Sequence, residues 1–128
     1  MGHEERRKYP RVQIFDPISY LSLDSDGKTI HQNVAVVRDV SQTGIQIEAF
    51  LEITAKTISL MFFDMHKNQI EVKGKVVYCR RNESGQFSIG IHLIGNEAEY
   101  LRFVKALVKS YHYQKEKSRL AISPGIQN

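Results

Sequence analysis

The sequence lacks the features that mark several classes of protein. Its 128 residues include a single cysteine, Cys79, which excludes an internal disulfide bond and fits a reducing compartment. No apolar run approaches the ~20 residues that a membrane-spanning helix needs. Residues 1–6 contain no apolar stretch of the kind found in a secretory signal. We therefore expect one cytoplasmic domain that has no membrane partner.

Motifs for catalysis and for metal binding are also missing. The sequence has no G-x-S-x-G, no phosphate-binding P-loop and no G-x-G-x-x-G. The five histidines are scattered, without the spacing of metal ligands. Cys79 lies in an expected strand, where a packed side chain is a commoner role than a nucleophile. These absences argue against an enzyme and against a metal or other cofactor.

The charge of the chain is modestly positive. Lys and Arg number 18 and Asp and Glu number 14, which gives a formal net charge of +4. This balance favours an anionic partner, but it does not choose among a nucleotide, a nucleic acid and a membrane surface. Hydrophobic residues make up 41% of the chain, which is ordinary for a globular domain with a core.

The middle of the chain alternates apolar and polar residues in the manner of β-strands. Residues 12–93 divide into about six such segments, separated by polar turns. The dipeptide Asp26-Gly27 is a strong signal for a hairpin between the first two segments. Ile45 and Ile47 alternate with polar residues and are expected to face the core.

The apolar spacing becomes helical after Gly95. Asn96 followed by Glu99 resembles a capping box, which predicts where the helix begins. Apolar residues then recur at helical spacing: Leu101, Val104, Leu107, Val108 and Tyr111. Together the segments predict a mainly β fold, a small antiparallel barrel of about six strands with a C-terminal helix packed on it. We expect a flexible basic arm at 1–11, the barrel and helix at 12–117, and a frayed tail at 118–128.

Two polar motifs stand out from this pattern. Residues 6–11 read Arg-Arg-Lys-Tyr-Pro-Arg, and residues 39–44 read Asp-Val-Ser-Gln-Thr-Gly. Guanidinium groups match phosphate and the O6/N7 edge of guanine, and a carboxylate accepts from the ring N–H and amino group of guanine. Each motif alone is weak, because a basic terminus is usually solvated and Asp-x-Ser-x-x-Gly is usually a turn whose glycine has a positive φ.

In this order and separation, the two motifs resemble those of the PilZ domain family. That family has an Arg-x-x-x-Arg arm, here Arg7 to Arg11, and an Asp/Asn-x-Ser-x-x-Gly turn, here from Asp39 to Gly44. The resemblance covers roughly residues 4–115. It implies a six-stranded split β-barrel with a C-terminal helix, and a stand-alone bacterial receptor for cyclic di-GMP, which contains two guanines and two phosphates.

The resemblance also assigns roles to the arginines of the arm. The equivalents of Arg7 and Arg11 grip guanine edges and phosphate as the arm folds over the barrel. In the family, an arginine at the position of Arg6 goes with two stacked cyclic di-GMP molecules, whereas an apolar residue goes with one. We therefore expect two ligand molecules per chain.

The remaining candidate residues lie in the expected barrel. Asp39 and Ser41 offer a carboxylate and a hydroxyl from the end of a strand, and Gly44 leaves room for backbone to approach a ligand. Some family members place an aromatic near Tyr78 against a guanine, although its parity with the core residues of its strand predicts a buried side chain equally well. Arg80 either reaches a phosphate or is solvated.

These observations predict a receptor that orders residues 1–11 when cyclic di-GMP binds and then signals to an unknown protein partner. Two alternatives remain open. The first is a small basic barrel that binds nucleic acid, although the basic residues are not interleaved with the exposed aromatics that single-strand binders use. The second is a PilZ-like interaction module that has lost its ligand.

Overall fold

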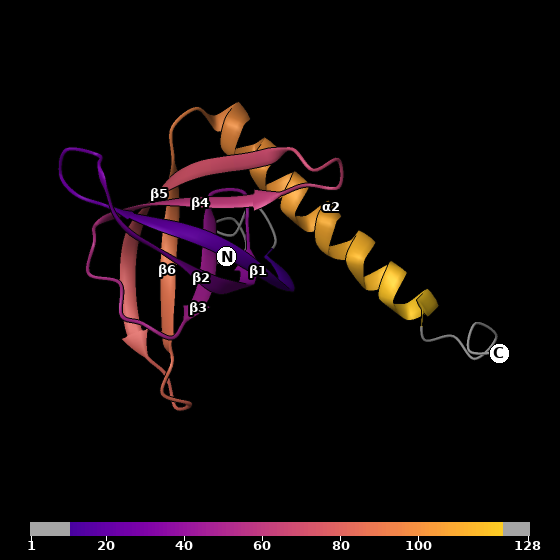
Figure 1. Cartoon of the computed structure of the whole chain (residues 1–128), viewed down its shortest axis with the longest axis horizontal. Helices are drawn as coiled ribbons and strands as arrows, with labels where there is room; N and C mark the ends of the chain where they lie inside the picture. Colours follow the sequence, from indigo (N-terminus) through magenta and orange to yellow (C-terminus); the bar gives the residue numbers. More distant parts are fainter. Residues whose placement is uncertain (1–10, 122–128) are drawn as a thin grey trace, which may run out of the picture.

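The computed structural model describes residues 11–121 and shows a small β-barrel followed by one long helix (Figure 1). The strands are β1 (Val12–Leu23), β2 (Thr29–Val40), β3 (Gly44–Ala49), β4 (Thr57–Phe63), β5 (Gln69–Arg81) and β6 (Phe87–Ile94). The helix is α2 (Glu97–Ala121). All six strands lie where the alternation of apolar and polar residues predicts them.

The strands pair antiparallel in the order β1-β2-β3-β6-β5-β4 and close into a barrel through β1 and β4. The closure is partial, because β3 pairs with β2 only from Val36 onward and residues 29–35 of β2 pair with β1 alone. The predicted six-stranded antiparallel barrel with a C-terminal helix is therefore confirmed.

Three of the hairpin turns share one feature, in which a side-chain oxygen replaces missing backbone partners. In each turn this oxygen accepts N–H bonds from the backbone two and four residues later; the acceptors are Asp24, Asp64 and Asn82. The backbone N–H of Asn68 is the main cause that lowers the pKa of Asp64 below its ordinary value. Such side chains are favoured in turns for this reason.

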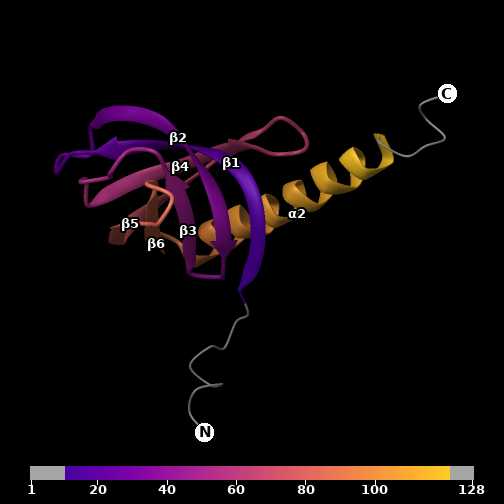
Figure 2. The same cartoon turned by 90° about the horizontal axis from the view of Figure 1, so that it is seen from below.

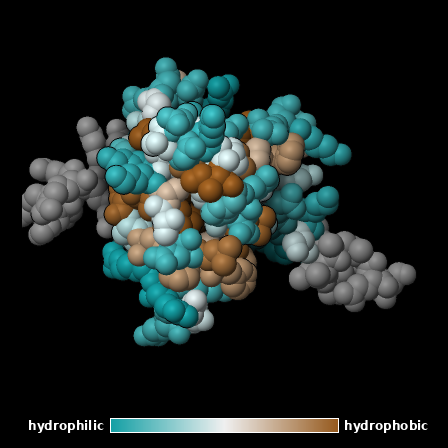
Figure 3. Space-filling view, turned by 60° about the vertical axis from the view of Figure 1, so that its left-hand side comes forward, coloured by the Kyte–Doolittle hydropathy of each residue, from teal (hydrophilic) through white to brown (hydrophobic). Residues whose placement is uncertain are grey.

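Alternate side chains of the strands fill the barrel, and α2 closes one of its ends. Phe103 and Leu107 of α2 are fully buried, and the Phe103 ring meets that of Phe62 edge-on at 5.2 Å. Asn96 caps the helix by accepting the backbone N–H of Ala98 at 2.8 Å. The second half of α2 projects beyond the barrel (Figure 2). The face seen in Figure 3 is mainly polar, with apolar patches between polar groups.

Two details of α2 differ from the prediction. The core face of the helix includes Phe103, whereas Leu101 is only half-buried and lies outside the core cluster. The large Phe103 ring sets the rotation of the helix because it fills the barrel end, and Leu101 lies about 200° around the axis from it. The helix also continues to Ala121 instead of ending at Lys117, since no glycine or proline interrupts it there.

Among residues 11–121, no helix has both the length and the apolar character needed to cross a membrane.

Phe103 should therefore dominate the attachment of α2 to the barrel. We expect Phe103→Ala to lower the free energy of unfolding by about 3–5 kcal/mol, because it leaves a cavity against Phe62. Leu101→Ala should cost less than about 1.5 kcal/mol, since its side chain already contacts solvent. Urea denaturation followed by circular dichroism measures both values, and equal losses would contradict this assignment of the core face.

Candidate functional site

The second motif forms a tight turn between β2 and β3. The backbone N–H of Ser41 donates to the carbonyl of Gly44 at 2.8 Å, and the N–H of Gly44 lies 3.2 Å from Ser41 Oγ. Gly44 is not among the glycines with positive φ, so conformational strain does not explain this glycine. A Cβ atom at residue 44 would lie 3.2 Å from the carbonyl oxygen of Ile91. Close packing of two strands therefore favours glycine at residue 44, and Ser41 stabilises the turn.

The structure brings the two motifs together through an ion pair. Arg11 Nη1 lies 3.4 Å from Asp39 Oδ2, although the two residues are far apart in sequence. They meet because β1 and β2 pair with Gln13 opposite Asp39. The side chain of Asp39 is 19% exposed and that of Arg11 is 47% exposed, so the carboxylate is held in the surface while the guanidinium still faces solvent.

The other oxygen of the same carboxylate lacks a partner. Asp39 Oδ1 is buried and accepts no hydrogen bond from any described residue. Burial of a charged oxygen without a donor is unfavourable, and such atoms in folded proteins are usually satisfied. A ligand that brings an N–H donor to Asp39 would remove this cost. The site therefore offers an unpaired hydrogen-bond acceptor, Asp39 Oδ1, beside the guanidinium of Arg11.

Asp39 belongs to a row of residues that crosses five strands on the outside of the barrel. The strand registers align Gln13, Asp39, Gln46, Gly90 and Tyr78. The row faces outward, because residues next to its members point into the core: Ile14, Val40, Ile45, Ile47, Ile89 and Ile91. Adjacent strands are about 4.8 Å apart, so the row from Asp39 to Tyr78 spans roughly 14 Å. Gln46 was not predicted, since a single polar residue between apolar ones carries no signal in the sequence.

Tyr78 lies in this row because β5 contains a bulge. The register shifts between Val76 and Tyr78, and the extra residue Val77 is exposed. The strand parity that predicts a buried Tyr78 is therefore wrong after the bulge. The Tyr78 ring covers Gly90, where a Cβ atom would lie 2.1 Å from its Cε2. The Arg80 guanidinium lies over this ring, 4.4 Å from its centroid.

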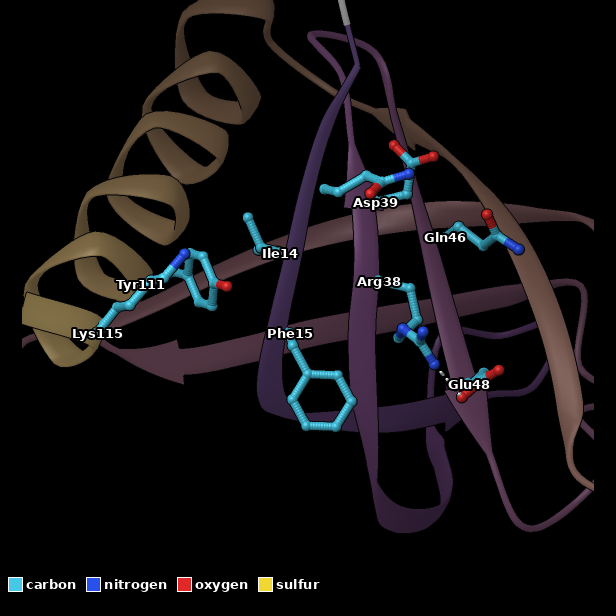
Figure 4. A pocket seen from close by; sticks show the side chains of 9 residues that line it. Ile14, Phe15, Arg38, Asp39, Gln46, Glu48, Tyr111 and Lys115 are labelled. Carbon is cyan, nitrogen blue, oxygen red and sulfur yellow. Dashed lines mark hydrogen bonds and ion pairs between the residues drawn. The ribbon is translucent and has the colours of Figure 1, made fainter. Parts of the chain in front are cut away.

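A cavity of about 540 Å³ adjoins this row and is shown in Figure 4. Its walls come from β1, β2, β3 and α2, and they include Asp39 and Gln46. Arg38 lies in a bulge of β2 and donates to Glu48 across 2.7 Å. The volume is within the roughly 300–1,000 Å³ that is typical of pockets for small molecules.

Two predicted residues, Arg6 and Arg7, lie outside the described residues. The structure unites the others on one outer face: Arg11, Asp39, Ser41, Gly44 and Tyr78. Within residues 11–121, no group of three or more His, Cys, Asp or Glu side chains could hold a metal ion.

The comparisons with known proteins agree with this architecture. The model of the PilZ domain family matches residues 5–110, so the chain belongs to that family. A search among curated proteins gave no match.

Three solved structures have a similar fold. The PilZ domain of YcgR from Escherichia coli, solved with c-di-GMP, has a TM-score of 0.60 and 10% identity, with 91% of this chain and 99% of that chain covered. The Bacillus subtilis inhibitor of motility has a TM-score of 0.57 and 13% identity over 92% of this chain and 54% of that one. The PilZ domain of CeSA from a cellulose-synthesizing bacterium has a TM-score of 0.53 and 19% identity over 77% and 97%. The chain thus spans about half the length of the Bacillus subtilis protein.

Gly90 should be needed to seat Tyr78 on the outer face. We expect Gly90→Ala to lower the free energy of unfolding by about 1–2 kcal/mol, because the new methyl group displaces the ring. In a Tyr78→Ala background the same substitution should cost nothing, since the clash is gone. A double-mutant cycle by urea denaturation measures this coupling, and additive effects would refute the proposed contact.

Proposed function

We propose that this protein is a receptor for cyclic di-GMP that binds the nucleotide on the outer face of the barrel, around Asp39. The observation that carries the proposal is the Asp39 carboxylate, whose Oδ2 pairs with Arg11 while its buried Oδ1 has no donor among the described residues. This arrangement matches the chemistry of one base in particular.

Guanine presents complementary groups to both side chains. Its ring N–H and amino group donate to a carboxylate, and its O6 and N7 atoms accept from a guanidinium. Hydrogen bonds that involve a charged partner contribute roughly 1.5–3 kcal/mol each, and paired bonds add selectivity. Asp39 can take the donor edge of the base, and Arg11 can take its acceptor edge or a phosphate.

Arg6 and Arg7 complete the proposed site from the N-terminal side. Arg7 precedes Arg11 by four residues, so it can reach at most about 14 Å from Arg11 along the chain. This distance is enough to place a second guanidinium over the Asp39 row. Four cations within residues 6–11 repel one another, and an anionic ligand removes that repulsion. Binding is therefore coupled to ordering of residues 1–11.

On the far side of the row, Tyr78 offers an aromatic face that is already partly buried on Gly90. The YcgR domain solved with c-di-GMP supports the ligand class. The proposed activity is binding, not catalysis, and its output passes to a downstream protein. Ligand binding changes the charge and shape of the outer face, which gives such a partner two distinct surfaces to recognise.

Isothermal titration calorimetry tests the proposal directly. Cyclic di-GMP should bind with micromolar affinity or better, and cyclic di-AMP and GTP much more weakly. Adenine presents an amino donor where guanine presents the O6 acceptor, so the arginine contacts are lost. Equal affinity for the two cyclic dinucleotides would rule the proposal out. Tighter binding of a short DNA, with a steep salt dependence, would favour a nucleic-acid-binding barrel instead.

Variants of the same experiment locate the site. Arg11→Ala and Asp39→Asn should each weaken binding by about tenfold or more, since each removes a charge-assisted contact. Arg119→Ala is the matched control, because Arg119 is exposed near the end of α2 and pairs only with its neighbour Glu116 among the described residues. If the folded Asp39→Asn variant binds with wild-type affinity, the ligand site lies elsewhere.

Arg6 should set the stoichiometry. We propose two cyclic di-GMP molecules per chain, because a third guanidinium beside Arg7 and Arg11 helps to offset four phosphate charges. Arg6→Leu should leave binding intact but lower the calorimetric ratio from two toward one. A ratio of one in the wild type, unchanged in the variant, would show that Arg6 is merely solvated.

A further inference from the structure

Two cation–aromatic pairs line the cavity beside Asp39, one formed between β1 and β2 and the other on α2 (Figure 4). On the barrel, the Arg38 guanidinium lies 5.3 Å from the centre of the Phe15 ring. On α2, Lys115 Nζ lies 5.8 Å from the centre of the Tyr111 ring. The motifs and strand patterns that predict the rest of the site give no indication of this second pair.

The two cations differ in their electrostatic surroundings. Arg38 is neutralised by Glu48, whose Oε1 accepts its hydrogen bond at 2.7 Å. Lys115 forms no ion pair with any of the described residues. Its ammonium group is therefore the cation of this cavity that remains available to an anion. A flexible four-carbon stem lets it reach across the cavity opening.

Tyr111 forms a fixed part of the cavity wall that α2 provides. It lies one helical turn before Lys115 and packs partly against the hydrophobic core. A half-buried ring that is held from behind presents one apolar edge or face to the cavity at little entropic cost. Together the two side chains offer an aromatic surface with a cation above it, which suits a phosphorylated purine.

We propose that Tyr111 and Lys115 of α2 form a further part of the ligand site, in which Lys115 binds a phosphate of the nucleotide and Tyr111 contacts its base or sugar. This inference rests on the proposed function, because the cavity is shared with Asp39 and Gln46. A ligand that bridges Asp39 and Lys115 also joins the barrel face to the projecting half of α2.

Calorimetry with cyclic di-GMP tests whether the charge of Lys115 contributes to ligand binding. Lys115→Met keeps the length and apolar stem of the side chain and removes its charge. It should weaken binding by roughly five- to tenfold, as expected for a partly screened charged contact. Lys117→Met is the matched control, because Lys117 is exposed on the same helix and does not line the cavity. The control should bind like the wild type.

A fluorescence probe tests whether the ligand contacts Tyr111 in the cavity wall, independently of the binding affinity. The chain contains no tryptophan, so a single introduced one reports only its own surroundings. Emission of the Tyr111→Trp variant should change on saturation with cyclic di-GMP. The Tyr113→Trp variant should not respond, because Tyr113 is 46% exposed and lies outside the cavity.

The outcomes separate this inference from the proposed function. Normal wild-type binding, with equal affinities for the two lysine variants and no response of Tyr111→Trp, would overturn the role of α2 alone. Absence of any wild-type binding would overturn both. Selective weakening by Lys115→Met, or a response confined to Tyr111→Trp, supports the inference even if the other variant is poorly folded.

Discussion

Closure of six antiparallel strands is the constraint on which the rest of this structure depends. In a closed barrel every strand has one filled side and one outer side, so most polar side chains lie outside. The inward residues include Val37, Val40, Ile47 and Ile89, all without measurable exposure. Groups that could recognise a ligand are thereby collected on the outer face. The ion pair of Arg11 with Asp39 follows from this confinement, since the pairing of β1 with β2 brings both residues to one edge.

Two bulges adapt the outer face to a site. In β2, Val37 and Val40 both point inward, so Arg38 and Asp39 between them both lie outside. In β5, Val76 and Cys79 pack against the core, and the two residues between them likewise face outward. A bulge changes the direction in which one side chain points and twists the strand without interrupting the barrel. Each bulge thus adds a side chain of the proposed site, Asp39 or Tyr78, to a face that strict alternation would not supply.

The two halves of helix α2 have different surroundings. Its first half is held by Phe103 and Leu107, which close the barrel. Its second half carries Tyr111 and Lys115 to the cavity beside Asp39 and then continues into solvent.

The sequence by itself determined the six strands, the helix start at Asn96 and the family of the chain. Local signals are enough for these, since alternation, turn residues and motif spacing act over a few positions. It also indicated Asp39, Ser41 and Gly44 as neighbours, because they share one turn. Only the tertiary structure decided that Tyr78 faces outward, that Phe103 and not Leu101 anchors the helix, and that Gln46 and Lys115 line one cavity with Asp39. The physical reason is that bulges, helix rotation and the meeting of distant strands are set by how side chains fill a common core, and no local pattern records that packing.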